Sequence, residues 1–510
     1  MTTRLNRRGF LATTSVAATS LAFLGPKGLR AQEGGVLRFA LSTYPPSFDA
    51  WASSGTAAGT IKLMMHRGLV GYGPDGLMRG ELAESWEVAE DGTWTFKLRD
   101  ATWHDGSPVT AEDIAWNVTE AQKPDSAAYL QGQLASITSI ETPDAKTVIM
   151  KTTEPQATLP GWFAHYNMPM IKKGEPRDTM IGSGPFKMEK NDRGVSLTLT
   201  AYDGYYKEGL PKLARVEAIV YADENLRVAA LEAGDVDLIE YVPWQAMSQI
   251  EGNGELKLDT VDGPFMYLTF NGSKPPFDNP LVRRAVAHAI KREDIVAAAF
   301  YDRGGALEHL PIAEKSEFFN PEYANGWNYD PDKAKALLAE AGYPDGFDCT
   351  MLSTAQYGMH QSTAEVCQAY LSMIGINVTL DLPEWSTRVK KGNEGQYDLA
   401  IMGTTAANND PDGLSNQVDG SLPNSFVRSF QLPTPEITDL FAKGRAIFDT
   451  EERKAIYKEL ERVAIETAPM VGLAWRSQGY AMKAGVEGFT NMPGQLTFYS
   501  GITLEDTMLG

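Results

Sequence analysis

The sequence predicts a mixed α/β protein built from two or three domains. Short segments that alternate apolar and polar residues, as strands do, are interleaved in blocks with segments whose apolar residues recur at helical spacing. The chain has 510 residues, which is too many for one hydrophobic core. Because it contains no long linker and no short-period repeat, we expect domains that exchange the chain more than once.

Residues 1–31 have the character of an export signal. They contain basic but no acidic residues, and residues 9–25 are uncharged and mildly apolar over a length too short to span a membrane. The pair Arg7-Arg8 followed by Phe10 favours twin-arginine export over an ordinary secretory signal. No cysteine lies near the end of this segment to carry a lipid anchor. We therefore expect a signal peptide and a soluble protein of the Gram-negative periplasm.

The acidic balance of the chain excludes some classes of partner. Its formal net charge is −20 at pH 7, whereas nucleic acids and anionic membranes are bound by basic patches. The six histidines lack the spacing of metal ligands, so we expect no metal and no cofactor. Cys349 lies in a strand-like run and Cys367 in a helical pattern, which leaves open whether they form a disulfide or stay reduced.

The N-terminal part of the chain predicts a strand, a loop, a hairpin and a helix, in that order. Residues 36–41 form a strand pattern that runs into a loop containing Tyr44 and two prolines. Residues 86–98 alternate apolar with polar residues around a central turn, which predicts a β-hairpin. Thr110 is expected to cap a helix, and Asp113 favours the helix dipole.

The remainder predicts further strands and helices in alternating blocks. The expected strands are residues 186–200, 216–220, 266–270, 378–382 and 399–402. The expected helices are residues 226–233, 280–290, 331–341 and about 450–466. Asn279 and Asp330 each precede a proline and mark two helix starts, and Gly234 marks a helix end.

Known catalytic patterns give no support for an enzyme. Residues 71–76 match the glycine pattern of dinucleotide sites, but Pro74 and the residues after it do not open a helix, so we expect a tight turn. The sequence contains no phosphate-binding loop and no zinc-protease or serine-hydrolase pattern. We therefore expect no catalytic residues and a binding protein, with a periplasmic hydrolase or oxidoreductase as the alternative.

Several motifs, in a fixed order, resemble one family of binding proteins. The motifs occupy residues 82–87, 94–99, 103–113, 182–186, 233–237, 270–271, 276–286 and 330–344. They resemble the family 5 extracellular solute-binding proteins, which are the dipeptide, oligopeptide and nickel receptors of ABC importers. Each motif alone is modest, but the set in register is highly specific, and it covers essentially the whole chain after the signal.

The resemblance implies a type II, cluster C-like periplasmic binding protein fold, with two lobes around a hinged central cleft and an extra domain. Domain I would be discontinuous and would contain residues 32–76, 185–275 and 483–510. Domain II would contain residues 77–184, and domain III would contain residues 276–482.

The implied function is that of a periplasmic receptor of an ABC importer. A monomer would capture a small organic solute, peptide-like by family default, as its hinge closes, and deliver it to the membrane permease with its ATPase. A chaperone-like binder of unfolded chains is a further alternative.

A polar loop near the N-terminus is the first candidate for ligand contact. Ser53, Ser54, Gly55 and Thr56 resemble a loop that holds the ligand backbone in dipeptide receptors, with a solvated loop as the alternative. Tyr44, in the preceding loop, is a further candidate ligand contact.

Trp385 is the second candidate, because it follows the strand at residues 378–382 and stands between the polar residues Glu384 and Ser386. Its ring is expected to stack on a ligand or to attract a cationic group. Packing in the core is the alternative.

The third candidate is the run Asn408, Asn409 and Asp410, at the place where peptide receptors keep a cleft loop. By that resemblance, Ala407 occupies the position of the aspartate that binds the peptide's amino terminus. A buried ammonium without a partner costs several kcal/mol. A peptide is therefore the first candidate ligand by family default only, and a glycoside, an opine or another amine is a further candidate. Asp410 and Asp412 are the candidates to replace the aspartate. The nickel receptors' histidine has no clear equivalent, so a metal chelate is not expected.

Overall fold

A long mixed sheet organises the molecule. The computed structural model describes residues 34–52 and 55–510, and Gly34–Gly510 forms one compact unit. Within it an 11-stranded sheet has the order β15-β14-β16-β12-β17-β11-β1-β10-β9-β8, and β13 pairs with β17. The strands are β1 (Val36–Leu41), β8 (Phe186–Asp192), β9 (Ser196–Ala201), β10 (Arg215–Val220), β11 (Leu238–Ile239), β12 (Leu256–Phe270), β13 (Gly304–Ala306), β14 (Phe347–Leu352), β15 (Ile376–Asp381), β16 (Leu399–Thr404) and β17 (Val471–Lys483).

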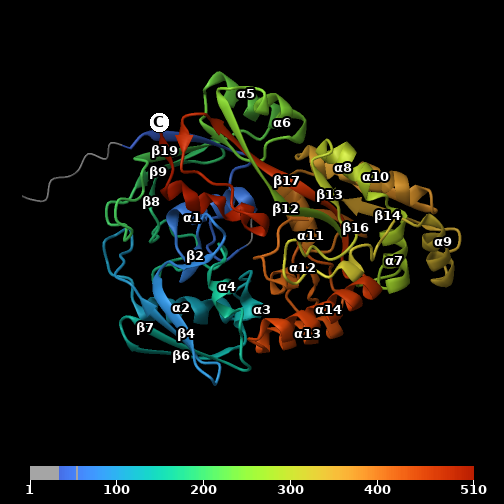
Figure 1. Cartoon of the computed structure of the whole chain (residues 1–510), viewed down its shortest axis with the longest axis horizontal. Coiled ribbons are helices and arrows are strands. Elements are labelled where there is room, and N and C mark those ends of the chain that lie inside the picture. Colours follow the sequence, from blue (N-terminus) through green and yellow to red (C-terminus); the bar gives the residue numbers. More distant parts are fainter. Residues whose placement is uncertain (1–33, 53–54) are drawn as a thin grey trace, which may run out of the picture. The chain divides into compact units, whose positions relative to one another are not determined.

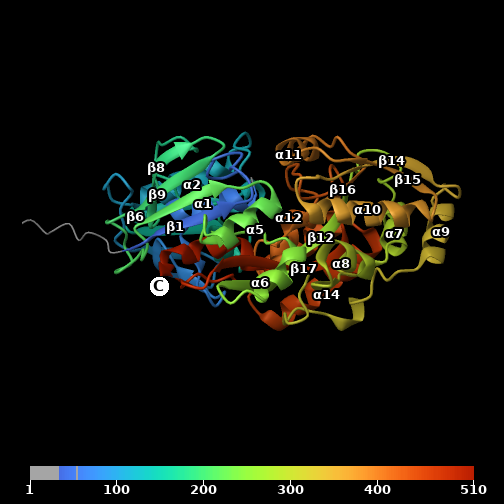
Figure 2. The ribbon, with the colours of Figure 1, turned by 90° about the horizontal axis from the view of Figure 1, so that it is seen from above.

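Two long strands, β12 and β17, connect the two parts of this sheet. They run antiparallel, and their register shifts between Asp262 and Phe265 and again between Met266 and Tyr267. One end of β17 pairs with β11, and the far end of β12 pairs with β16. Figure 1 shows the pair passing from the part that holds β8 and β9 to the part that holds β14 and β16, and Figure 2 shows the same passage from above. The final eight residues of β12 are all buried, as expected for a strand covered on both faces.

A separate four-stranded sheet lies below β2 in Figure 1. Its order is β4 (Ala83–Val88), β5 (Trp94–Leu98), β7 (Thr147–Thr152), β6 (Ile137–Asp144). The predicted hairpin is confirmed, because β4 pairs antiparallel with β5 and Trp86 faces Phe96. Residues 71–76 contain the end of β2 (Val70–Tyr72) and the turn that leads to β3 (Met78–Gly80), with which β2 forms a second hairpin, so the expected tight turn is also confirmed. A last short pair joins β18 (Val486–Glu487) to β19 (Met508–Leu509).

Helices cover both sheets, and several begin where the sequence predicts. The helices are α1 (Thr56–Met65), α2 (Ala111–Gln122), α3 (Gln131–Leu134), α4 (Leu159–Phe163), α5 (Glu224–Ala233), α6 (Trp244–Glu251), α7 (Pro280–Ala289), α8 (Arg292–Phe300), α9 (Pro331–Glu340), α10 (Gly358–Ser372), α11 (Trp385–Asn393), α12 (Ser415–Val418), α13 (Pro435–Ala446) and α14 (Thr450–Thr467), with the 3-10 helices η1 (Pro321–Tyr323), η2 (Pro411–Leu414) and η3 (Gly494–Glu505). Thr110 caps α2 in a capping box with Asp113. Asn279 and Asp330 cap α7 and α9, and Gly234 ends α5 in the left-handed conformation, with φ 80°.

The apolar core of the described residues falls into three large clusters. One surrounds β12, β16, α7 and α10, a second joins α2 to β5 and β7, and a third lies between β1, β9, β10 and α1. The boundaries of domains I, II and III stay a prediction. Cys349 and Cys367 are both buried and free, which resolves the open question of a disulfide in favour of two thiols. Among the described residues, no helix combines the length and apolar character needed to cross a membrane.

Candidate ligand-binding site

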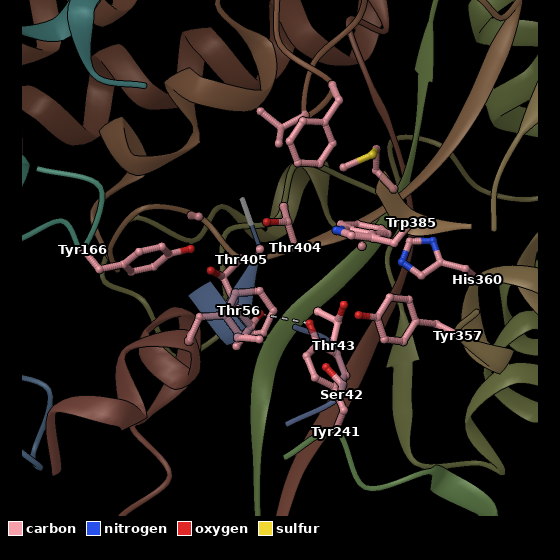
Figure 3. Close-up of a pocket in the computed structure, with 18 of the residues that line it drawn as sticks. Ser42, Thr43, Thr56, Tyr166, Tyr241, Tyr357, His360, Trp385, Thr404 and Thr405 are labelled. Carbon is pink, nitrogen blue, oxygen red and sulfur yellow. Dashed lines mark hydrogen bonds between the residues drawn. The ribbon is translucent and has the colours of Figure 1, made fainter. Parts of the chain in front are cut away.

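A cavity lies where the ends of several strands and helices meet, and its empty space, including the part open to solvent, is about 800 Å³. Figure 3 shows Tyr166 on one side of it and Trp385, His360 and Tyr357 on the other. Its lining residues are Ser42, Thr43, Gly55, Thr56, Ala57, Tyr129, His165, Tyr166, Tyr241, Tyr357, Met359, His360, Trp385, Met402, Gly403, Thr404, Thr405, Ala406, Ala407, Phe426, Val427, Phe498 and Tyr499. Strand ends place polar groups here, because Ser42 follows β1 and Thr404 ends β16, as is usual for ligand sites of open α/β sheets.

Aromatic rings form one wall of the cavity around Trp385. The Trp385 ring meets Tyr357, His360 and Phe426 edge to face, at centroid distances of 5.5, 5.9 and 6.0 Å. Tyr241 continues this wall, 5.6 Å from the Tyr357 ring. Because edge-to-face neighbours fix the Trp385 ring, its face is held ready for a ligand at little further entropic cost.

A second aromatic group lies across the cavity. Tyr499, on η3, packs edge to face on Tyr166 at 5.0 Å and on His165 at 5.8 Å. Its hydroxyl donates to the backbone oxygen of Ala407, at 2.7 Å. This hydrogen bond ties η3 to the segment after β16.

Hydroxyl groups supply the polar part of the lining. Thr56 Oγ1 lies 3.2 Å from the Tyr241 hydroxyl, and Figure 3 marks this hydrogen bond. Ser42 is fixed by Glu240, whose Oε1 accepts from the Ser42 hydroxyl at 2.8 Å and from its backbone N–H at 2.9 Å. Such groups orient a ligand's own hydroxyl and carbonyl groups.

The lining holds no carboxylate and no lysine or arginine among the described residues. Its two histidines are buried, and burial lowers the pKa of His165 to about 3 and that of His360 well below its usual value. Both imidazoles are therefore neutral at physiological pH. The groups that face the cavity are therefore aromatic rings, hydroxyl groups, two methionines, neutral imidazoles and backbone.

Three of the predicted site residues come together here. Gly55, Thr56 and Trp385 all line the cavity. Gly55 has φ 94°, and a Cβ at this position would lie 3.6 Å from Trp385 Nε1. A side chain at residue 55 would therefore be strained and would approach the Trp385 ring. Ser53 and Ser54 lie outside the described residues, as does the predicted signal peptide.

The other predicted site residues lie elsewhere. The Tyr44 hydroxyl donates to Asn191 Oδ1 on β8, at 2.6 Å. Asn408 Oδ1 accepts from the Asp410 N–H at 3.0 Å, and Asn409 Oδ1 accepts from the Gln495 N–H at 3.1 Å. None of these predicted residues is among those that line the cavity, and their contact with a ligand stays a prediction.

Neither acidic residue of this loop is free to replace the missing aspartate. Asp410 pairs with Arg453 at 2.8 Å. Asp412 is fully buried, where its carboxylate pairs with Arg445 at 2.7 Å and accepts from the Thr158 hydroxyl at 2.7 Å. Ala407, in contrast, does line the cavity.

Sequence reasoning missed the tyrosines that line the cavity. They are Tyr129, Tyr166, Tyr241, Tyr357 and Tyr499. Tyr241 follows the short strand β11, so an aromatic residue just after a strand was one available signal. The others stand in segments whose partners are remote in sequence, and no local pattern distinguishes them from core tyrosines.

The fold and the cavity together define a two-lobed protein that binds a small solute. The chain belongs to the bacterial extracellular solute-binding proteins, family 5, because the model of the family's middle region matches residues 78–426. It is thus a substrate-binding receptor. The alternatives of a periplasmic hydrolase or oxidoreductase have no support in this family.

Relatives of known structure or function agree with this assignment. The PBP AgaA from A. tumefacien R10, solved in complex with agropinic acid, is 40% identical with a TM-score of 0.91, and the match covers 93% of this chain and 99% of AgaA. The glutathione-binding protein GsiB of Salmonella typhi is 27% identical over 467 residues, which is 88% of this chain and 90% of GsiB. DppA from Helicobacter pylori, in complex with peptide STSA, is 24% identical with a TM-score of 0.83 over 93% of this chain and 98% of DppA, and it supports the fold alone.

Proposed function

We propose that the chain is the periplasmic receptor of an ABC importer and that its ligand is an opine-type organic solute, with agropinic acid as the first compound to test. Residues 1–31 direct export by the twin-arginine route, and the exported protein works as a monomer. It encloses its ligand by hinge closure and presents the closed form to a membrane permease with its ATPase.

The observation that carries this proposal is the absence of a carboxylate from the described lining, which includes Ala407. By the family resemblance, Ala407 occupies the position of the peptide receptors' aspartate. A peptide brings an ammonium group that needs a negative partner when it leaves water. Asp410 and Asp412 are engaged by Arg453 and Arg445. An opine, which can present hydroxyl and carbonyl groups to Tyr and Thr side chains, suits this lining better than a peptide amino terminus does.

The similarity to AgaA supports the choice of compound, because that protein was solved with agropinic acid and is 40% identical to this chain. Glutathione is the competing candidate ligand, because the glutathione-binding protein GsiB is 27% identical to this chain.

Isothermal titration calorimetry tests the proposal. We expect agropinic acid to bind with a Kd well below that of glutathione or of the dipeptide Met-Leu. Mass spectrometry of the released compound should return it unchanged, because a receptor does not turn over its ligand. Tighter binding of either peptide than of agropinic acid would overturn the ligand class, and conversion of the compound would overturn the receptor role.

A further inference from the structure

Two buried arginines lie close to the cavity, and neither forms an ion pair with a described residue. Arg388, on α11, and Arg476, on β17, are both fully buried. Arg388 donates from Nη2 to the Ile401 oxygen at 2.7 Å and to the Met402 sulfur, while its Nε and Nη1 have no hydrogen-bond partner. Arg476 donates from Nη1 to the Met359 sulfur at 2.6 Å and interacts with the Tyr241 side chain, while its Nε and Nη2 make no well-aligned hydrogen bond.

Both guanidinium groups stand directly behind the aromatic wall. Arg388 lies over the rings of Trp385 and Phe426, with 5.7 and 5.5 Å from its Cζ to the ring centroids. Arg476 lies over the rings of Tyr241 and Phe498, at 5.8 and 6.0 Å. All four rings line the cavity, and so do the two methionines that contact the arginines. The cavity therefore has two positive charges immediately behind its lining. One acidic group behind the lining is Glu240, which holds Ser42 and whose pKa is raised by burial.

Arg292, among the described residues, is a buried arginine whose nitrogens are all hydrogen-bonded. Arg292 is also fully buried without an acidic partner within bonding distance, but its three nitrogens donate to five backbone oxygens, those of Leu307, Gly472, Ile290, Trp327 and Ala287. Arg388 and Arg476 each leave two nitrogens without a well-aligned hydrogen bond. A buried charge without a partner destabilises the protein, so a negative group of a ligand in the cavity would be stabilised by these two arginines.

One helix N-terminus adds to the positive potential. Helix α1 begins at the cavity, at Thr56, and its N-cap residue Gly55, which lines the cavity, provides no side chain to cap the first turn. Helix α10 begins at Gly358, whose N–H donates to the Glu224 carboxylate at 3.3 Å, so its start already has a negative partner. The partial positive charge of a free helix N-terminus favours an anion.

We propose that the cavity selects anionic solutes, and that a ligand carboxylate is stabilised by Arg388 and Arg476 from behind the aromatic wall. This inference rests on the proposed receptor function and narrows its ligand class to organic acids. The arginines act as positioning residues: they set the charge preference of the site, while Trp385, Tyr241 and the hydroxyl groups make the direct contacts.

The test compares agropinic acid with its carboxamide, which removes the charge and keeps the shape. By calorimetry at neutral pH, we expect the acid to bind at least about tenfold more tightly than the amide, as a charge–charge interaction in a desolvated site allows. Arg388→Met and Arg476→Met should each reduce this ratio towards one, and Arg388→Lys should restore part of it. The control Arg292→Met removes a buried arginine whose nitrogens are satisfied, and should keep the wild-type ratio in the folded fraction. Equal affinities for acid and amide, or an unchanged ratio in both pocket variants, would overturn the inference.

A second measurement uses the ligand-free protein and does not depend on agropinic acid. Arg388→Met and Arg476→Met should melt at or above the wild-type Tm, because each removes an unpaired buried charge, whereas Arg292→Met should melt well below it. If neither agropinic acid nor its carboxamide binds, the proposed opine ligand is wrong. The Tm values of the ligand-free variants then test the anion site on their own. A loss of Tm in both pocket variants as large as in Arg292→Met would then assign the two arginines to packing alone.

Discussion

Trp385 is held by neighbours on several sides, and its remaining surface is presented to the cavity. Tyr357, His360 and Phe426 meet its ring edge to face, and Arg388 lies over it. The ring is therefore already ordered before a ligand arrives, so contact with it costs little side-chain entropy.

We predict that Trp385→Ala weakens ligand binding by about tenfold or more, since losing a stacked aromatic anchor commonly costs ~1–3 kcal/mol. Trp385→Phe should retain much of the affinity, because it keeps an aromatic face. Calorimetry on both variants, with Tm measured to verify folding, checks this. Unchanged affinity in the folded alanine variant would place Trp385 in the core instead.

Glu461, on α14, and His309 form a buried pair away from the cavity. Glu461 Oε1 lies 4.0 Å from His309 Nδ1. Burial raises the pKa of Glu461 to about 8 and lowers that of His309 to about 4. At pH 7 the carboxyl is therefore mostly protonated and the imidazole neutral, so this contact is not an ion pair.

The Glu461 carboxyl predicts a pH-dependent stability. Between its ordinary pKa of 4.5 and about 8, the unfolded chain loses a proton that the folded chain keeps, so this group's contribution to stability falls as pH rises. His309 acts in the opposite sense from about 4 to 6.5, where only the unfolded chain binds its proton. Above pH 6.5 the effect of Glu461 is not opposed by His309.

We therefore expect Glu461→Gln to gain stability relative to the wild type as pH rises from 6.5 to 8. The difference in unfolding free energy between the two proteins isolates Glu461 from other groups, such as Lys62, whose pKa burial lowers to about 7. His309→Gln, by contrast, should show the same change in unfolding free energy as the wild type between pH 6.5 and 8. A variant-minus-wild-type difference that is flat from pH 6.5 to 8 would contradict the assignment.

At the scale of residues, sequence patterns identified part of the cavity. Gly55, Thr56 and Trp385 were predicted and do line it. Tyr241 and Tyr499 were not, because their position depends on how remote segments pack. The unpaired state of Arg388 was also beyond sequence reasoning, since a missing partner is a property of the folded interior.

Among the elements, helix α2 begins with a reciprocal cap. The Thr110 side chain accepts from the Asp113 N–H, and the Asp113 carboxylate accepts from the Thr110 N–H at 2.8 Å. Both orphan donors at this helix start are satisfied by neighbouring residues.

Thr110→Ala should lower the unfolding free energy by ~1 kcal/mol, the usual cost of losing an N-cap. Thr119→Ala is the matched control: its exposed hydroxyl donates within the same helix, to the Ala115 oxygen, so its loss should have little effect. Chemical denaturation of both variants measures the two values. Equal stability of the two variants would mean that the cap contributes nothing measurable.

Element starts were predictable where a cap and an apolar stripe coincide, as at Thr110, Asn279 and Asp330. Helix η3 was not predicted. Its sequence begins with one glycine and contains a second, together with aromatic and β-branched residues, which favour no helix. It is held by packing on α1, where a Cβ at Gly501 would come within 3.0 Å of Thr60.

For the whole molecule, polar contacts join segments 77–184 and 276–482. The Thr158 hydroxyl donates to Asp412 at 2.7 Å, and Gln133 donates to Asn416 at 2.6 Å. The backbone N–H of Ala157 donates to the Arg445 oxygen at 2.7 Å. These bonds are expected to exist only in the closed form of a hinged receptor.

Thr158→Val should therefore weaken ligand binding by up to about tenfold without touching the cavity, because losing a hydrogen bond to a charged group destabilises the closed form. Thr138→Val is the control, since its hydroxyl donates to Lys151 within the four-stranded sheet. Calorimetry gives the affinities, and small-angle scattering should register a larger radius of gyration for Thr158→Val. If Thr158→Val has the affinity and the radius of gyration of the wild type, the Thr158–Asp412 hydrogen bond does not contribute to closure.

The overall topology followed from family motifs rather than from local patterns. Strands at residues 36–41 and 266–270 were predicted, yet their placement in one sheet depends on β17, which is remote from both. Such pairings are set by tertiary packing, which a single sequence does not encode locally.

Helix η3 brings Phe498 and Tyr499 to the same cavity as Ser42 and Thr56, which lie at the opposite end of the chain. Contacts between such distant segments form late, because the intervening chain must first be ordered. Affinity for the solute should therefore return last when the protein refolds. By linkage, a bound solute also protects the final segment from proteases. Capture of its cargo thus reports that a molecule has completed folding.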